Sequence, residues 1–92
     1  MRFAWDEAKN ETNIRDHKID LADVPPVFDC PMLAELDERE DYGEDRWIGI
    51  GLLGNIPVVV VFTERQGDTI RIISARKANR HERRKFREAI AN

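Results

Sequence analysis

Cysteine is nearly absent from this sequence, since Cys30 is the single one among 92 residues. One thiol cannot close a disulfide within the chain and cannot supply a cysteine-based zinc site, as in a protein kept in a reducing compartment. We interpret Cys30 as an inert packing residue. Histidine pairs at metal-binding spacing, such as His-Glu-x-x-His, are also missing, so we expect no metal and no other cofactor.

Long apolar runs are missing too. The longest covers residues 56–62, is interrupted by Pro57, and is far shorter than the roughly 20 residues of a membrane-spanning helix. The N-terminal residues turn charged at Asp6 and contain neither a long apolar stretch nor a small-residue cleavage site, which argues against a signal peptide. We therefore expect a cytoplasmic protein that does not contact a membrane.

The chain is also short. Its composition, 41% hydrophobic and 36% charged, suits one globular domain, which we expect to span residues 1–92. A domain of this size buries only about 60–65% of the surface that its unfolded chain exposes, so its own core leaves it modestly stable. Binding to a protein partner would add to that stability.

The net charge of −3 conceals two parts of opposite sign. Residues 1–63 carry 6 basic and 14 acidic side chains, whereas residues 64–92 carry 9 basic and 4 acidic ones. A concentrated positive surface can hold a polyanion even on an acidic protein, because charges are screened over roughly 8 Å at physiological salt. The basic C-terminal part is therefore either a polyanion-binding surface or a solvated helix face.

The first third of the chain predicts short elements. A strand over residues 3–5 is followed by Asp6, a suitable N-cap for a helix over residues 7–16 that ends at His17 and Lys18. Ala8 and Ile14 are the only apolar residues of that helix, so we expect it to bury only the narrow edge that carries these two side chains. Asp20 caps a second helical turn, which the pair Pro25-Pro26 keeps short or kinked.

Strand patterns fill the middle of the chain. Residues 32–45 are acidic and irregular, and we interpret residues 38–45 as a mobile hairpin connection that follows a short strand and has little function at its tip. Residues 46–53 alternate an apolar face with a face carrying Gly49 and Gly51, where another segment can approach closely. Residues 58–62 have the β-branched character of a central strand, and Thr69 to Arg76 form the last one. Turns of two to four residues join these three strands into an antiparallel meander.

A basic helix is predicted at the C-terminus. Asn79 and Glu82 form a variant capping box that opens a helix running to about Ala89, with a narrow apolar stripe at Phe86 and Ile90. The whole is an α+β fold, in which a small antiparallel sheet packs with N-terminal helices and this helix. The cations Arg80, Arg83, Arg84 and Lys85 suit RNA, DNA or an acidic partner, while Glu82 either pairs with Arg83 or Arg84 or serves as a base or orients an arginine.

Three arginines flank the apolar residues of the last hairpin. Strict alternation places Arg76 on one face with Ile70, Ile72 and Ser74, and Arg71 on the opposite face, while Arg65 ends the central strand. A guanidinium in such a place either pairs with an acid, Glu64 being the nearest candidate for Arg71, or forms a fork that holds phosphate.

Two histidines could move protons, because histidine exchanges a proton near neutral pH. His81 lies among arginines in the first turn of the basic helix, where surface decoration is the better interpretation. His17 lies at a helix C-terminus, where it either acts as an acid or caps backbone carbonyls. Lys9 and Asn13 share a helical face with it, and Asp16 lies beside them.

Several segments together resemble the BrnT family of toxins, which is similar in fold and activity to RelE-type ribonucleases. The resemblance covers almost the whole chain and rests first on Phe3-x-Trp5-Asp6-x-x-Lys9-x-x-x-Asn13-x-x-x-His17 and Arg46-Trp47-Ile48-Gly49-Ile50-Gly51. The other matching segments are Val27-Phe28-Asp29, Thr63-Glu64-Arg65, Arg71-Ile72-Ile73-Ser74-Ala75-Arg76-Lys77-Ala78 and Glu82-Arg83. Two positions depart from the family pattern, because Lys18 replaces a usual glycine and Pro25-Pro26 replaces helix-forming residues.

The resemblance implies a metal-independent endoribonuclease that inhibits growth and is neutralised by a BrnA-like antitoxin, which alone contacts DNA. We then predict that Arg65 and Arg76 stabilise charge, that Lys9 and His17 transfer protons with Glu82 in reserve, and that the remaining cations bind RNA: Arg71, Arg80, Arg83, Arg84 and Lys85. The competing interpretation is a degenerate toxin or a non-enzymatic binding module that docks an acidic protein or assists a partner repressor on DNA.

Overall fold

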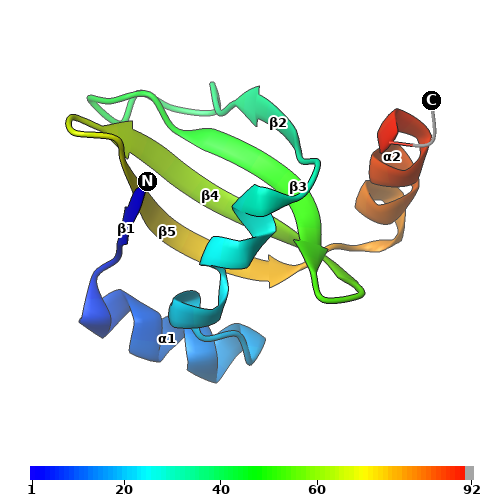
Figure 1. Cartoon of the computed structure of the whole chain (residues 1–92), viewed down its shortest axis with the longest axis horizontal. Helices are drawn as coiled ribbons and strands as arrows, with labels where there is room; N and C mark the ends of the chain where they lie inside the picture. Colours follow the sequence, from blue (N-terminus) through cyan, green and yellow to red (C-terminus); the bar gives the residue numbers. More distant parts are fainter. Residues whose placement is uncertain (91–92) are drawn as a thin grey trace.

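A five-stranded sheet forms the centre of the molecule (Figure 1). The computed structural model describes residues 1–90, so the last two residues of the expected 1–92 domain lie outside the described residues. The strand order is β1-β5-β4-β3-β2, and every neighbouring pair is antiparallel except β1 with β5. The strands are β1 (Arg2–Ala4), β2 (Leu33–Leu36), β3 (Trp47–Leu53), β4 (Ile56–Arg65) and β5 (Thr69–Lys77).

Helical segments lie before and after the strands as the sequence predicts. They are α1 (Glu7–His17), the short 3-10 helices η1 (Leu21–Asp23) and η2 (Pro25–Asp29), and α2 (Arg80–Ile90). Asp6 caps α1 by accepting from the Lys9 N–H, and Asp20 caps η1 by accepting from the Ala22 N–H. The α+β fold class is confirmed, and the short parallel strand β1 makes the sheet a mixed one.

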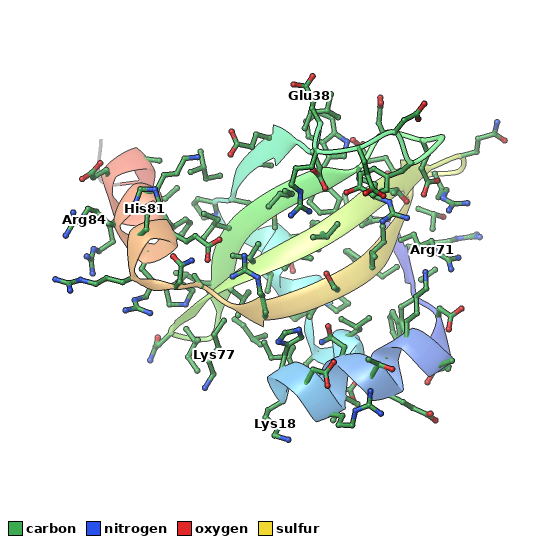
Figure 2. The ribbon with its side chains drawn as sticks, turned by 180° about the vertical axis from the view of Figure 1, so that it is seen from behind. Lys18, Glu38, Arg71, Lys77, His81 and Arg84 are labelled. Carbon is green, nitrogen blue, oxygen red and sulfur yellow. The ribbon has the colours of Figure 1, made fainter. Side chains whose placement is uncertain are left out.

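The two faces of the sheet are covered differently. The main core lies under η1 and η2, where Leu21, Val24 and Val27 pack against Val58, Val60 and Ile72. On the other face, which we call the α2 face, Phe86 packs against Ile50 and Val59 near one end. Figure 2 looks onto this second face, and no helix lies over the strands between α2 and the loop that contains Glu38.

The glycines of β3 serve the close approach that their spacing predicts. A Cβ on Gly51 would lie 2.6 Å from the Val27 side chain, and one on Gly49 would collide with the sulfur of Met32. The segment from η2 to Met32 therefore packs directly on the backbone of β3. Cys30, at the end of η2, is exposed, so its interpretation as a packing residue was wrong.

A register shift in the last hairpin changes which side chains share a face. Val61 pairs with Ser74 but Phe62 pairs with Ile72, so β5 has one extra residue at Ile73. Alternation restarts after that bulge, and Arg76, opposite Val59, lies on the α2 face whereas Ile72 lies in the main core. The prediction that Arg76 shares a face with Ile70 and Ile72 was wrong, because strict alternation does not survive a bulge.

Helix α1 is attached to the sheet by amides rather than by apolar groups. Ala8 and Ile14 are exposed, with Ile14 at 39%, so the predicted apolar edge was wrong. Asn13 is buried instead, donating to the carbonyls of Ile19 and Ala75 and accepting from the Ala75 N–H, at 2.9, 3.0 and 3.1 Å. Because β1 pairs only with the start of β5, this amide takes the place of a neighbouring strand at Ala75.

Helix α2 is attached by one aromatic side chain. Phe86 is 5% exposed, whereas Ile90 is 42% exposed, so the predicted stripe from Phe86 to Ile90 is reduced to its first member. The remaining side chains of the helix are mostly exposed. Within residues 1–90 no helix is long and apolar enough to cross a membrane.

Candidate functional site

A groove of about 450 Å³ runs between α1 and the edge of β5. It brings Lys9 and His17 together with Ser74, although the sequence separates these residues by more than fifty positions. The full lining is Ala8, Lys9, Thr12, Asn13, Asp16, His17, Ile73 and Ser74. The predicted polar edge of α1 therefore lines a groove that is open to solvent.

The positions of Lys9 and His17 are set by their spacing along α1 and by the point at which this helix ends. Lys9, Asn13 and His17 recur every four residues, so they share one face of α1, and the bonds of Asn13 to Ala75 turn that face toward β5. The helix stops directly after His17, because Lys18 adopts a left-handed conformation with φ of 61°. Its N–H still donates to the Ile14 carbonyl at 2.9 Å, as in helices that end on glycine.

The β5 bulge gathers three arginines on the α2 face. Arg71 pairs in register with Thr63 and Arg76 with Val59, while Arg65 lies two residues beyond Thr63 on the same side of β4. Arg71, labelled in Figure 2 near the start of β5, makes no hydrogen bond or ion pair with Glu64 or any other residue in 1–90. Arg65 and Arg76 lie at opposite ends of β4, so the structure places them on one face but not side by side.

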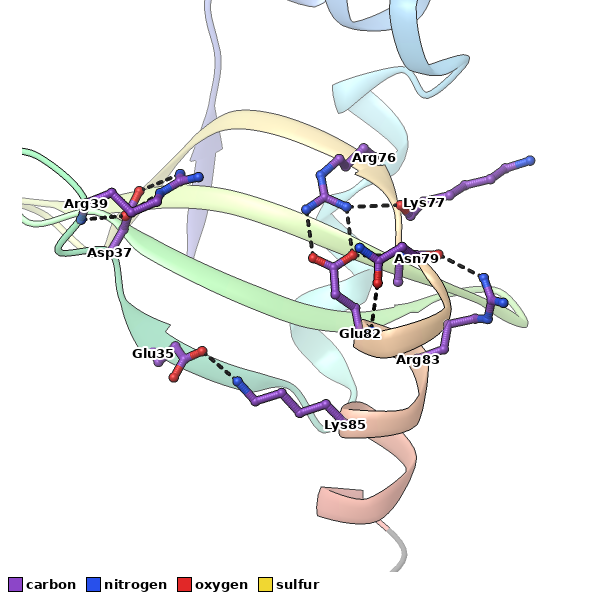
Figure 3. Close-up of polar contacts among 10 residues, drawn as sticks. Glu35, Asp37, Arg39, Arg76, Lys77, Asn79, Glu82, Arg83 and Lys85 are labelled. Atoms are coloured by element: carbon purple, nitrogen blue, oxygen red, sulfur yellow. Dashed lines mark hydrogen bonds and ion pairs between the residues drawn. The ribbon is translucent and has the colours of Figure 1, made fainter.

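Arg76 is held as a fork by Glu82. Its Nη1 and Nη2 atoms each donate to one carboxylate oxygen of Glu82 at 2.8 Å (Figure 3). This contact lowers the pKa of Glu82 to about 2 and raises that of Arg76. The Arg76 side chain is still 42% exposed, so its charge remains accessible to an anion.

The same carboxylate starts α2. Glu82 accepts from the Asn79 N–H and Asn79 accepts from the Glu82 N–H, both at 2.8 Å, which completes the predicted capping box. Glu82 pairs with Arg76 rather than with Arg83 or Arg84, and Arg83 donates to the Ala78 carbonyl instead. The turn from β5 to α2 is thus fixed by hydrogen bonds that also aim Arg76.

The opposite end of the α2 face carries a second pair of basic side chains, Arg65 and Arg46, of which only Arg65 was predicted from the sequence. Arg65 donates to the Thr63 hydroxyl at 3.3 Å and its Nη2 lies 3.2 Å from Glu44. Arg46 lies beside the same carboxylate, with its guanidinium 4.1 Å from the centre of the Tyr42 ring. The position of Arg46 before a strand whose faces alternate was the signal that could have found it.

The loop after β2 is organised around a buried carboxylate. The Asp37 side chain is fully buried and accepts two bonds from Arg39 at 2.8 Å and one from the Tyr42 hydroxyl at 3.1 Å (Figure 3 for Arg39). The bonds from Arg39 hold the pKa of Asp37 well below its usual range. The connection contains no helix or strand, as predicted, but these hydrogen bonds give it a defined arrangement next to Arg46.

The cations of α2 are exposed to solvent. Arg80 and Arg84 make no hydrogen bond or ion pair within the described part of the chain, and Lys85 forms one exposed ion pair with Glu35 at 3.0 Å. Arg84 and His81, labelled in Figure 2, are exposed, which agrees with His81 as surface decoration. Among residues 1–90, no three His, Cys, Asp or Glu side chains gather as a metal site would require.

Comparisons with known proteins found a family model and a solved structure that this chain matches. A family model described as "Ribonuclease toxin, BrnT, of type II toxin-antitoxin system" matches residues 5–82. The fold is similar to the crystal structure of the Brucella abortus ribonuclease toxin, BrnT, with a TM-score of 0.69 and 30% identity, covering 87% of this chain and 99% of that one. No curated protein matches the sequence. The matched range includes the groove and the arginines of the α2 face but ends at Glu82, before most of the α2 cations.

Proposed function

Because the chain belongs to the BrnT family of ribonuclease toxins of type II toxin–antitoxin systems, we propose that it cuts RNA where the α1 groove meets Arg76. The observation that carries this proposal is the position of Ser74. It lines the groove with Lys9 and His17, and it lies two residues from Arg76 on the same strand. Proton-transfer groups and a fixed guanidinium thus border one stretch of β5.

The reaction we propose is attack of an RNA 2′-hydroxyl on the adjacent phosphorus. The bond from phosphorus to the 2′ oxygen forms, the bond to the 5′ oxygen breaks, and the products are a 2′,3′-cyclic phosphate and a 5′-hydroxyl. A base takes the 2′ proton, an acid gives a proton to the departing oxygen, and cations stabilise the phosphorane, so no metal ion is required. Arg76 supplies that charge, since donors aimed where charge develops contribute roughly 3–4 kcal/mol.

His17 and Lys9 are the groups that we assign to proton transfer, as they line the groove from the same face of α1. Glu82 is assigned a different task. With a pKa near 2 it is a weak base at neutral pH, and its two bonds to Arg76 make it a positioning residue for the guanidinium. The pH–rate profiles of the Lys9 and His17 variants will show which limb each residue controls.

The remaining cations hold the RNA strand on either side of the reacting phosphate. Arg71 and Arg65 lie on the α2 face, and the α2 side chains extend the positive surface beyond Arg76: Arg80, Arg83, Arg84 and Lys85. Contacts to phosphate depend steeply on salt, because binding releases condensed counterions. RNA affinity should therefore fall as salt rises, with the α2 cations contributing to the slope more than to the chemical step.

A BrnA-like antitoxin is the partner that we propose for α2, with DNA bound only by the antitoxin. An acidic antitoxin segment would associate quickly with Arg80 and Arg84, which have no ion-pair partner within residues 1–90. It would find an apolar anchor at Ile90, since Phe86 is buried. Reversal of Arg83 and Arg84 to Glu should weaken antitoxin and RNA binding together, whereas reversal of Glu38 and Glu40 should affect neither strongly. Unchanged antitoxin affinity at low salt would place the partner on another surface.

Two experiments test the function itself. Expression without a partner in a bacterium should arrest growth and deplete intact RNA, whereas a docking module would do neither. Purified protein should cut RNA in the presence of EDTA and leave 2′,3′-cyclic phosphate ends, which mass spectrometry identifies. Loss of activity in EDTA that added metal restores would contradict the proposed metal-independent chemistry.

A further inference from the structure

A carboxylate of the protein lies between two arginines at the loop end of the α2 face. One oxygen of Glu44 is 3.2 Å from Nη2 of Arg65, and the other is 3.9 Å from Nε of Arg46. Glu44 belongs to the acidic loop after β2, whereas the two arginines come from the ends of neighbouring antiparallel strands. An anionic group that faces two guanidinium groups in this way occupies the position that a phosphate of a bound strand would take.

Arg46 is oriented before any ligand binds. Its guanidinium lies over the Tyr42 ring, and the Tyr42 hydroxyl donates to the buried Asp37, so the stacking partner is itself fixed. The Arg46 side chain is only 25% exposed, which limits the directions from which an anion can reach it. A preoriented, partly desolvated guanidinium binds phosphate at a lower entropic cost than a free surface arginine does.

Glu44 does not satisfy Arg46. The Nε atom of Arg46 is buried and has no hydrogen-bond partner within residues 1–90, because 3.9 Å exceeds the length of a hydrogen bond. A buried donor without an acceptor costs free energy, so a better placed acceptor would be favoured there. The tetrahedral oxygens of a phosphate can hydrogen-bond both arginines, whereas the carboxylate of Glu44 leaves the Nε atom of Arg46 without an acceptor.

We propose that Arg46 and Arg65 form a second phosphate-binding site for the RNA strand, and that Glu44 occupies this site until RNA displaces it. The inference rests on the proposed function, since it takes RNA as the ligand. Arg65 lies on the same face as Arg76 but at the other end of β4, so this site holds a phosphate away from the cut. Glu44 thereby weakens RNA binding in the free protein, and its side chain moves aside as the strand binds.

The test compares two variants that remove one negative charge from the same loop. Glu44→Gln releases Arg65 and Arg46, whereas Glu38→Gln changes an exposed residue that makes no hydrogen bond or ion pair in the described chain and points away from the sheet (Figure 2). Affinity is measured with a 2′-O-methyl oligoribonucleotide, which lacks the nucleophile and cannot be cut. Glu44→Gln should bind it roughly two- to fivefold more tightly, the size expected for one exposed ion pair. Glu38→Gln should give only the smaller effect of lost charge.

A double-mutant cycle identifies the arginine that Glu44 blocks. In an Arg65→Gln background, Glu44→Gln should improve binding less than it does in the wild type, because only Arg46 remains to be released. Arg46→Gln alone should weaken binding and reduce its salt dependence. Equal affinities of Glu44→Gln and Glu38→Gln, or a gain of the same size with and without Arg65, would overturn the proposal.

Cleavage of unmodified RNA by the wild-type protein separates this inference from the function on which it rests. A wild-type protein that cuts RNA, with no gain from Glu44→Gln, removes the second phosphate site and leaves the function standing. A wild-type protein that neither binds nor cuts RNA removes both. If Glu44→Gln strengthened binding of the antitoxin and not of the oligonucleotide, the arginine pair would be a partner contact and the RNA site would be wrong.

Discussion

Helices α1 and α2 have the same length, 11 residues each, but they are attached to the sheet by different forces. In α1 the buried residues are Asn10 and Asn13, whose amides bond to the backbone of Leu21 and Ala75. In α2 the buried residue is Phe86, supported by two ion pairs at the surface. Amide bonds fix both the distance and the rotation of a helix, whereas one aromatic contact beyond the fixed first turn leaves the rest of α2 more freedom.

The difference matches the tasks that we assign to the two helices. Proton transfer needs groups held within hydrogen-bond reach of the reacting atoms, and α1 carries Lys9 and His17. Attraction of RNA or of an acidic partner needs charge but no fixed geometry, and α2 carries Arg80 and Arg84 without partners in the described chain. Arg76 combines the two properties, since it is a partly exposed cation like those of α2 but is held in a fixed position by Glu82.

Removal of Arg76 should have the largest effect. Arg76→Ala should slow RNA cleavage by about 10²–10³-fold, because a preorganised donor at the phosphorane is lost. Arg80→Ala removes the same charge from an exposed side chain of α2 and should reduce the rate only through weaker binding. Single-turnover rates at saturating RNA, with circular dichroism as a check of the fold, measure both. Unchanged cleavage by folded Arg76→Ala would show that Arg76 takes no part in the chemical step and that it does not differ in this respect from the exposed cations of α2.

The second largest effect should be a loss of stability when the attachment of α1 is removed at Asn13, a polar residue that a hydrophobic pattern would not select. Asn13→Ala leaves the N–H and carbonyl of Ala75 without partners in a buried place, so we expect about 2–3 kcal/mol of lost stability. Ile14→Ala removes the neighbouring apolar side chain, which is 39% exposed, and should cost only about 0.5 kcal/mol. Urea unfolding of both variants gives the two free energies. A larger loss for Ile14→Ala would mean that apolar contact, not the amide, holds α1.

These two positions also show what sequence patterns can predict. The element order, the three-strand meander, the caps at Asp6 and Asp20 and the end of α1 at His17 and Lys18 all follow from local chemistry, and each is present. The buried face of α1 does not follow, because asparagine counts as polar in any hydrophobic pattern. Only the free edge of β5, a long-range property of the fold, makes an amide at position 13 the best neighbour for Ala75.

The sequence indicated which residues belong to the candidate site better than it indicated how these residues are arranged in space. Lys9 and His17 share a helical face by spacing alone, and their groove confirms that they lie together. The arginines could not be assigned to faces, because one extra residue at Ile73 reverses the alternation and leaves no mark in the sequence. The pairing of Glu82 with Arg76 and the stacking of Arg46 on Tyr42 depend on how loops fold back over the sheet.

Acid should reveal how much the Arg76–Glu82 contact stabilises the α2 end of the molecule. The pKa of Glu82 is lowered from 4.5 to about 2, so its contribution is fully present above pH 4.5 and is lost as the pH falls toward 2. Since the side chain is mostly buried, we expect about 2 kcal/mol between wild type and Glu82→Gln at neutral pH, falling toward zero near pH 2. Asp37 also loses its bonds in acid, but it is common to both proteins and cancels in their difference. A difference that stayed constant from pH 6 to pH 2.5 would contradict this assignment.

The end of α1 should give the smallest effect, and one of opposite sign. Lys18 has a positive φ of 61°, which costs a residue with a Cβ up to about 1 kcal/mol relative to glycine. Lys18→Gly removes that strain but also loses the bond from Lys18 Nζ to the Arg15 carbonyl and adds freedom to the unfolded chain, so the net gain should be a few tenths of a kcal/mol.

A gain of this size raises the melting temperature of a domain of this length by about 2 °C, which calorimetry resolves. Lys18→Ala is the matched control, because it loses the same side-chain bond while keeping the strained backbone, and it should not be stabilised. The left-handed residue follows His17 directly, so a helix end that keeps its shape should leave cleavage unchanged in Lys18→Gly. A stabilised variant with altered cleavage would mean that the strained backbone at Lys18 sets the position of His17. The fixed geometry that Asn13 gives to α1 would then include His17, the last residue of the helix.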